Sequence, residues 1–250
     1  MIILKTSREL ELMREAGRIS HLALMAGVRA VQPGATTMDV NRAVHETITS
    51  LGGKPSFLGY GGFPAAACVS INDEVIHGIP TKRRKIQEGD IVSIDTGAIY
   101  QGFHGDNAFT VAAGETSQRC RELMEVTQRC LELAIAAALP GNRLGDIGAA
   151  VEEYARSHGF GVVKEYVGHG IGSEMHQEPE VPNYGRAGHG QRLRPGMTLA
   201  IEPMINMEGD GVWKDKKDGW TIHTASGLPS AHFENTVAIT ENGPVVLTRP

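Results

Sequence analysis

The chain has 250 residues, a formal net charge of −5 and a pI near 6.1, with 41% hydrophobic and 21% charged residues. This length is sufficient for a sizeable hydrophobic core, and the acidic balance provides no basic face for nucleic acid. No apolar run approaches the ~20 residues that a membrane-spanning helix needs. We therefore expect a cytoplasmic protein that binds neither nucleic acid nor membrane.

The three cysteines exclude two further classes of protein. Cys68, Cys120 and Cys130 are odd in number and form no C-x-x-C pair, which argues against a disulfide scaffold and a zinc ribbon. Glycine is over-represented: the chain has 31 glycines among 250 residues, whereas glycine usually makes up ~7% of a protein. Without a collagen-type period, this excess indicates many tight turns or places where the backbone closely approaches another group.

The predicted helices recur along the chain as an internal repeat. A helix is expected from Ser7 onward, because Thr6 and Glu9 match a capping box. A Pro-Gly turn and a second helix follow within Pro33–Gly52. At an offset of 107 positions this segment matches Pro140–Gly159, with 8 of 20 pairs identical. The match predicts a duplicated α+β unit with a pseudo-twofold axis.

The same offset relates two strand-like segments that end in carboxylates. Gly89–Asp95 aligns with Gly196–Glu202, so that Asp95 and Glu202 would be symmetry-related. Since no Pro- or Ser-rich linker separates the halves, we expect one domain spanning 1–250. Its half-repeats would cover about 1–115 and 116–250.

Asp95 and Asp106 lie on two strand-like runs that form a predicted hairpin. If Tyr100 and Gln101 form the two-residue turn, Asp95 faces Asp106 directly. Like charges at that spacing repel unless a proton or cation lies between them. The alternative, in which both side chains point to solvent from a loose turn, is left open at this point.

Two glutamates in the second half favour the cation. Glu202 lies within the predicted strand Met197–Ile205, and Glu234 lies within a second one, His232–Thr240. Four carboxylates and one imidazole carry a charge of −4, which balances two divalent cations. An oxygen-dominated donor set suits Mn²⁺, Fe²⁺ or Co²⁺.

His169 is the candidate imidazole because Gly168 and Gly170 flank it and permit close backbone approach. His77, in a His-Gly-Ile-Pro segment, and His176 are further candidates for the site. The remaining histidines are predicted to be structural: His21, His45, His104, His158, His189, His223 and His232.

Together these motifs resemble the type I methionine aminopeptidases, roughly from Ile3 to Thr248. The motifs are His77-Gly-Ile-Pro, Ser93-Ile-Asp95 with Gly105-Asp106, Gly168-His169-Gly-Ile-Gly, Ile201-Glu202-Pro203 and Glu234-Asn-Thr. The resemblance implies the pita-bread fold, in which a duplicated α+β domain encloses a curved antiparallel sheet flanked by two helix pairs. It also implies a metallo-aminopeptidase that removes N-terminal methionine from nascent proteins and peptides, with preference for a small second residue.

The resemblance also assigns roles to individual residues. The ligands of two divalent ions (Co, Mn, Fe or Zn) would be Asp95, Asp106, His169, Glu202 and Glu234, with Asp106 and Glu234 shared. A metal-bridged hydroxide would attack the first peptide bond, with His77, His176 and Glu202 as catalytic residues. The substrate would contact Tyr60, Phe63, Cys68, His77, His176 and Trp220, with Phe57 and Met175 nearby.

Further expectations concern cations and partners. The backbone carbonyls of Asn72, Glu74 and Ser230 are candidates for a monovalent cation, as in relatives. The partner would be a peptide or nascent-chain N-terminus, and the enzyme would be monomeric. Ribosome docking near the charged segment Lys214–Asp218 is an open hypothesis, because such a segment is typical of a solvated turn.

Two alternatives remain at this stage. An X-Pro aminopeptidase or dipeptidase of the same fold would use the same ligands, although those enzymes usually carry an additional N-terminal domain. A non-catalytic binding module of this fold predicts a broken ligand set. Here all five ligand positions are filled.

Overall fold

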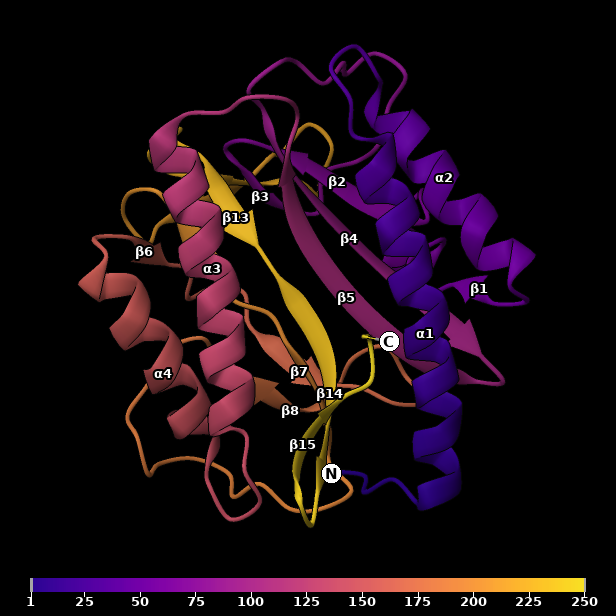
Figure 1. The fold of residues 1–250 in the computed structure, drawn as a ribbon, viewed down its shortest axis with the longest axis vertical. Helices are drawn as coiled ribbons and strands as arrows, with labels where there is room; N and C mark the ends of the chain where they lie inside the picture. The colour runs from indigo at the N-terminus through magenta and orange to yellow at the C-terminus, as the bar shows by residue number, and fades with distance from the viewer. Residues whose placement is uncertain (1, 250) are drawn as a thin grey trace.

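The computed structural model describes residues 2–249 and contains four α-helices in two pairs (Figure 1). The first pair is α1 (Ser7–Ala30) and α2 (Thr37–Ser50), and the second is α3 (Gln118–Ala137) and α4 (Leu144–Ser157). The predicted capping box begins α1: Thr6 accepts from the Glu9 backbone N–H, and the Glu9 carboxylate accepts from the Thr6 N–H.

The helices α2 and α4 preserve the 107-residue repeat. Each spans 14 residues, and their bounds differ by that offset at both ends. Asp39 in α2 and Asp146 in α4 each accept a hydrogen bond from the backbone N–H of the N-cap residue. The same local chemistry therefore starts both helices.

The sheet is antiparallel and curls between the two helix pairs (Figure 1). Nine strands belong to it, in the order β1-β4-β5-β14-β9-β7-β8, with β2 on β4 and β15 on β14. Their bounds are β1 Lys54–Pro55, β2 Ala67–Ile71, β4 Ile91–Tyr100, β5 Phe103–Ala112, β7 Gly168–Gly170, β8 Gln177–Val181, β9 Thr198–Ile201, β14 Glu234–Thr240 and β15 Gly243–Val246.

Two three-stranded sheets extend this framework. They comprise β13-β10-β6 and β11-β12-β3. The bounds are β3 Glu74–Ile76, β6 Gly161–Val162, β10 Met204–Asn206, β11 Val212–Lys214, β12 Ile222–Thr224 and β13 Ser230–His232; a single 3₁₀ turn, η1, covers Tyr60–Gly62. Within residues 2–249, no helix is both long and apolar enough to cross a membrane.

Each helix pair covers its own hydrophobic core. The α1/α2 pair packs over β2 and β4 through Val44, Ile48 and Ile94. The α3/α4 pair packs over β9 and β14 in the same way, through residues that include Leu199 and Val237. Burial of these apolar faces in two equivalent layers leaves the concave side of the sheet free to carry polar groups.

A close backbone contact between α1 and the sheet lies next to a predicted metal ligand. A Cβ added to Gly105, on β5, would lie 2.5 Å from the backbone nitrogen of Gly17 on α1. Only glycine fits at this crossing, because both neighbours are backbone. The contact fixes the position of Asp106, the next residue.

We expect Gly105→Ala to destabilise the fold by about 1–3 kcal/mol, because α1 must move away from β5. In a chain of this size the melting temperature would fall by roughly 3–10 °C. Differential scanning calorimetry measures the change. Gly211→Ala is the matched control, since the exposed Gly211 has only the Ala225 Cβ at 3.3 Å. Equal melting temperatures for the two variants would contradict the close-approach argument.

Candidate active site and metal centre

The β4–β5 hairpin differs in register from the prediction. Gln101 and Gly102 form the turn, and Tyr100 pairs with Phe103. Both turn residues have positive φ, 46° and 85°, as a type I′ turn requires, and Gly102 adopts this conformation without strain. A bulky Tyr100 at a positive-φ position would be strained. The expected direct pairing of Asp95 with Asp106 is therefore wrong.

In the observed register, Asp95 faces Ala108 and Asp106 faces Gly97. The two aspartates are thus diagonal neighbours on one face of the sheet. Residues in this diagonal relation lie about 7–8 Å apart. That spacing leaves room for a group between the carboxylates. The prediction that both lie on the same hairpin face is preserved, whereas the direct opposition is not.

The second half shows a related correction. Instead of one strand over Met197–Ile205, the chain forms β9 and β10, with Glu202 and Pro203 between them. The facing segment likewise divides into β13 and β14, on either side of Phe233. Proline lacks the N–H that a continuous ladder needs, and so the paired strands break there. Glu202 consequently lies at a break and not inside a strand.

The register across this break places two glutamates opposite each other. Ile201 pairs with Asn235 on one side, and Met204 pairs with His232 on the other. By the same register Glu202 stands opposite Glu234. Glu234 in turn pairs with Ala108, which pairs with Asp95. Asp95, Glu234 and Glu202 thus form a row of three carboxylates, with Ala108 of β5 between the first two.

His169, on β7, adds an imidazole to this row. Its Nε2 lies 3.6 Å from Glu202 Oε1 and 3.9 Å from Asp106 Oδ2. Its Nδ1–H donates to the carbonyl of Gly170 at 2.9 Å, which leaves the lone pair on Nε2. Burial lowers the pKa of His169 to about 3, so the ring is neutral, as a metal ligand must be.

The carboxylates have the properties of a cation site. Burial raises the pKa of Asp95 to about 7 and that of Glu202 to about 8. Burial followed by the neighbouring carboxylates raises the pKa values of Asp106 and Glu234 well above their usual range. Without bound cations these groups retain protons at pH values where exposed carboxyls are ionised.

Several of these oxygens also have no hydrogen-bond partner among residues 2–249. They are Asp95 Oδ1, Asp106 Oδ1 and Glu234 Oε1, all fully buried. Asp106, His169 and Glu234 each offer one donor atom, and these atoms lie within 4.8 Å of one another. Unpartnered buried oxygens that converge with a neutral imidazole fit divalent cations. The donor set contains no thiolate.

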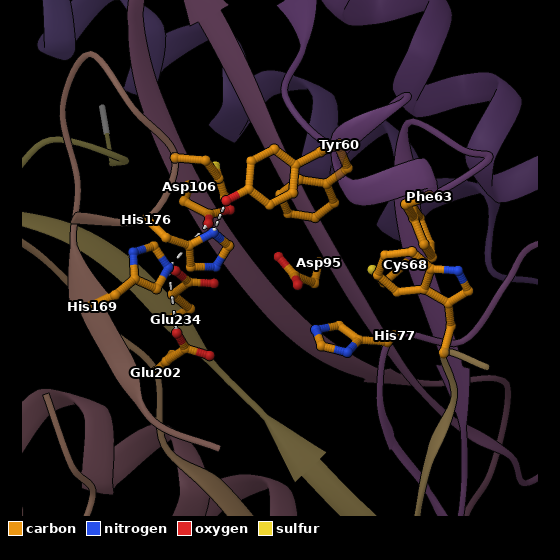
Figure 2. Close-up of a pocket in the computed structure, with 13 residues that line it drawn as sticks. Tyr60, Phe63, Cys68, His77, Asp95, Asp106, His169, His176, Glu202 and Glu234 are labelled. Atoms are coloured by element: carbon orange, nitrogen blue, oxygen red, sulfur yellow. Dashed lines mark hydrogen bonds and ion pairs between the residues drawn. The ribbon is translucent and has the colours of Figure 1, made fainter. Parts of the chain in front are cut away.

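The cluster forms one wall of a cavity that 13 residues line (Figure 2). The predicted metal ligands, catalytic residues and substrate contacts are all among them: Phe57, Tyr60, Phe63, Cys68, His77, Asp95, Asp106, His169, Met175, His176, Glu202, Trp220 and Glu234. In Figure 2 the metal-ligand candidates gather on one side, Phe63 and Cys68 lie on the other, and Asp95 lies between them.

The apolar side of the cavity is rigid and uncharged. The rings of Phe63 and Trp220 meet edge to face at 5.2 Å between centroids. Cys68 pairs with Asp95 across β2 and β4, and burial raises the pKa of its thiol well above the usual value. Cys68 is therefore a protonated lining residue and not a nucleophile.

His77 and His176 both line the cavity, the first half-buried and the second exposed. His77 has a positive φ of 61°, and its ring stands edge-on to Trp220 at 6.3 Å. Burial lowers the pKa of His77 to about 4, which keeps the ring neutral. The ring of His176 lies 4.2 Å from that of His169, and its Nδ1 is 2.8 Å from the Tyr60 hydroxyl oxygen.

One histidine of the predicted structural group, His232, lies beside the proposed ligands. His232 Nε2 lies 3.5 Å from Glu202 Oε2, and the ring is fully buried beside the cluster. The missed signal is the spacing His232-x-Glu234, since alternate residues of an extended segment share a face. Other predicted structural histidines have local partners: His104 contacts Ser56, and His223 contacts Asp73.

Comparisons with known proteins agree with this geometry. The model of metallopeptidase family M24 matches residues 11–241. A methionine aminopeptidase of Clostridium acetobutylicum is 51% identical, with 99% of each chain covered. The chain belongs to metallopeptidase family M24. The predicted resemblance to the type I methionine aminopeptidases is confirmed.

Solved structures of M24 peptidases confirm the pita-bread fold. The crystal structure of methionine aminopeptidase from Thermotoga maritima superimposes with a TM-score of 0.98, at 48% identity and full coverage of both chains. The prolidase of Pyrococcus furiosus has a TM-score of 0.80 at 27% identity, and the present chain covers 66% of it. The fold is thus shared with prolidases, whereas the full-length similarity is to methionine aminopeptidases.

Proposed function

We propose that this M24 peptidase removes N-terminal methionine with a dinuclear metal centre held by Asp95, Asp106, His169, Glu202 and Glu234. The single observation that carries the proposal is one cavity that joins these five donors to an apolar wall. Two divalent cations, when bound, supply Lewis acidity and lower the pKa of a water molecule toward neutrality. Asp106 and Glu234, central in the cluster, would be shared between them.

The apolar wall suits the methionine side chain. Tyr60, Phe63, Cys68 and Trp220 line it, with Phe57 and Met175 nearby. Aromatic and sulfur-containing side chains make favourable contacts with an unbranched, polarisable thioether. The neutral His77, which lines the cavity, would hold the amide of the second substrate residue through a hydrogen bond.

Glu202 is the proposed general base and acid. Its carboxylate lines the cavity beside His169, where it would accept the proton of the attacking water and pass it to the leaving nitrogen. The water oxygen joins the carbonyl carbon, the C–N bond breaks, and the proton leaves on the released amine. His176 would donate a hydrogen bond to the carbonyl oxygen as negative charge develops there.

Tyr60→Phe tests the orientation of His176. The substitution removes the hydroxyl that contacts His176 Nδ1 at 2.8 Å. A hydrogen bond worth about 0.5–1.5 kcal/mol corresponds to a fall in kcat of roughly three- to tenfold. Steady-state kinetics on a Met-Ala-Ser peptide give kcat and KM separately. Tyr166→Phe is the control; an equal loss in both variants would contradict this role for Tyr60.

A paired peptide assay tests the function itself. Chelator-stripped enzyme receives Mn²⁺, Fe²⁺, Co²⁺ or Zn²⁺ in turn and is given Met-Ala-Ser and Ala-Pro-Ala. We expect release of methionine and little release of alanine. Preferential release of alanine would identify an X-Pro peptidase instead. Protein that retains no transition metal and has no peptidase activity would identify a binding module.

The finer predictions belong to the same proposal. The preference for a small second residue and action on nascent chains in the cytoplasm rest on the family assignment. The carbonyls of Asn72, Glu74 and Ser230 are proposed to bind a monovalent cation; Asn72 O already accepts from Ser230 N at 2.8 Å. We further propose that the enzyme is a monomer with one domain, whose half-repeats cover about 1–115 and 116–250. Docking to the ribosome remains a hypothesis.

A further inference from the structure

His232 is a buried imidazole without a local partner. It ends β13 and is 1% exposed. Neither Nδ1 nor Nε2 forms a hydrogen bond with any residue in the range 2–249. A neutral imidazole carries one N–H donor and one acceptor, and leaving such groups unpaired in the interior costs about 1–3 kcal/mol each. By contrast, His104 and His169 each have a hydrogen-bonded Nδ1.

The groups nearest to the His232 ring are metal-ligand candidates. Its Nε2 is 3.5 Å from Glu202 Oε2, while Glu202 Oε1 lies 3.6 Å from His169 Nε2. The Glu202 carboxylate is thus placed between two imidazoles. Glu202, His232 and Glu234 each offer one donor atom, and the three atoms lie within 4.8 Å of one another.

This second group of donors is distinct from the one that contains His169. The first group comprises Asp106, His169 and Glu234, and only Glu234 is common to both. Each group contains one imidazole and at least one carboxylate. Glu234 therefore has an imidazole nitrogen within 4.8 Å in each of the two groups.

The backbone of His232 is firmly held. Its N–H donates to Thr110 Oγ1 at 2.9 Å, and the Thr110 hydroxyl donates to its carbonyl at 2.8 Å. On the other side of β13, Met204 pairs with His232 in the ladder with β10. A fixed backbone and complete burial of the side chain limit the positions that the ring can take, so that little conformational freedom is lost when it binds a ligand.

We propose that His232 is a sixth protein donor of the metal centre, supplying a second imidazole nitrogen beside the Glu202 oxygen that faces away from His169. The inference rests on the proposed five-ligand centre and extends it. Imidazole favours Fe²⁺, Co²⁺, Ni²⁺ and Zn²⁺ over Mn²⁺, for which carboxylates are sufficient. His232 would therefore shift the metal preference of this chain toward the nitrogen-binding ions.

The test counts imidazole ligands directly and needs no activity measurement. Protein containing nitrogen-15 histidine is loaded with NMR-active cadmium, and scalar coupling between cadmium and ring nitrogens is recorded. We expect coupling to two imidazoles in the wild type and to one, that of His169, in His232→Gln. His104→Gln is the matched control, a buried histidine on β5 that bonds to Ser56, and it should retain both couplings.

Coupling to His169 alone in wild-type protein would overturn the role of His232 and leave the five-ligand centre intact. Failure of cadmium to bind would overturn both. Loss of a coupling in His104→Gln would show that the second coupled nitrogen belongs to His104 and not to His232, and would also overturn the inference. The wild-type spectrum gives the number of imidazole ligands even if His232→Gln fails to fold. His232→Asn provides a second variant.

A competition experiment gives an independent readout. The ratio of Zn²⁺ to Mn²⁺ affinity, measured against a fluorescent chelator, should fall by about tenfold or more in His232→Gln. The same ratio should be unchanged in His104→Gln. An unchanged ratio in His232→Gln would contradict the proposed effect on metal preference.

Discussion

The substitution Asp106→Asn is expected to lower kcat/KM for a methionine-initiated peptide by at least about 10³-fold. Asp106 is buried at the centre of the cluster, 3.9 Å from His169 Nε2, and is one of the two proposed shared ligands. An amide offers one neutral oxygen in place of a bidentate anion. Loss of about 4 kcal/mol of transition-state stabilisation corresponds to roughly a thousandfold in rate.

Two measurements separate loss of chemistry from loss of folding in this variant. Metal content after dialysis should fall, whereas the melting temperature of the metal-free variant should equal or exceed that of the metal-free wild type. The second expectation follows because burial and then the neighbouring carboxylates oppose ionisation of Asp106, as its raised pKa shows, whereas an amide of the same shape carries no charge. Asp210→Asn is the control, since Asp210 does not line the cavity: it pairs with Arg156 and Lys164 at the surface and accepts a hydrogen bond from the Val162 backbone N–H. Unchanged turnover in Asp106→Asn would refute the two-metal proposal.

Removal of metal is expected to abolish activity and to reverse the pH dependence of stability. In the metal-free protein, burial raises the pKa of Asp95 to about 7 and that of Glu202 to about 8, from ordinary values of 3.8 and 4.5. Between about pH 4 and pH 8 the folded state therefore holds protons that the unfolded chain has released. The free energy of unfolding then falls as pH rises through this window.

Bound cations replace those protons and change the sign of the effect. At a free metal concentration of 100 times Kd, ligation stabilises the fold by about 2.7 kcal/mol, which raises the melting temperature by roughly 5–10 °C. Because binding requires ionised carboxylates, the gain should be larger at about pH 8 than at about pH 5. Calorimetry with Mn²⁺ and with chelator measures it. A metal-free melting temperature that rises over this range would contradict the buried-carboxylate argument.

The helices are the part of the fold that local sequence signals predicted. The Thr6–Glu9 capping box and the two Pro-Gly turns located the helix starts, because capping depends on residues within one turn of the chain. The repeat between Pro33–Gly52 and Pro140–Gly159 predicted a duplicated unit, and α2 and α4 reproduce its offset. The five donors were also visible as motifs, although their roles came through resemblance to a family.

The errors concern strand pairing and its consequences. The β4–β5 register shifted because Gln101 and Gly102 adopt the positive φ values of the turn, a choice that Tyr100 opposes sterically. Glu202 lies at a break that its neighbour Pro203 makes necessary, and no periodicity indicated that the facing strand would divide as well. Pairing joins residues distant in sequence, and a small change in one turn alters every opposite pair.

The sequence by itself determined which residue types are present, where the helices begin and that the chain is duplicated, since these features depend on neighbouring residues. Only the tertiary structure decided that Asp95, Glu234 and Glu202 form a row across the sheet, because that row depends on register between distant strands. It also placed His232 beside Glu202, although His232 resembles an ordinary core histidine in the sequence. Burial and proximity, which determine the charge state of each group, exist only once the strands have paired.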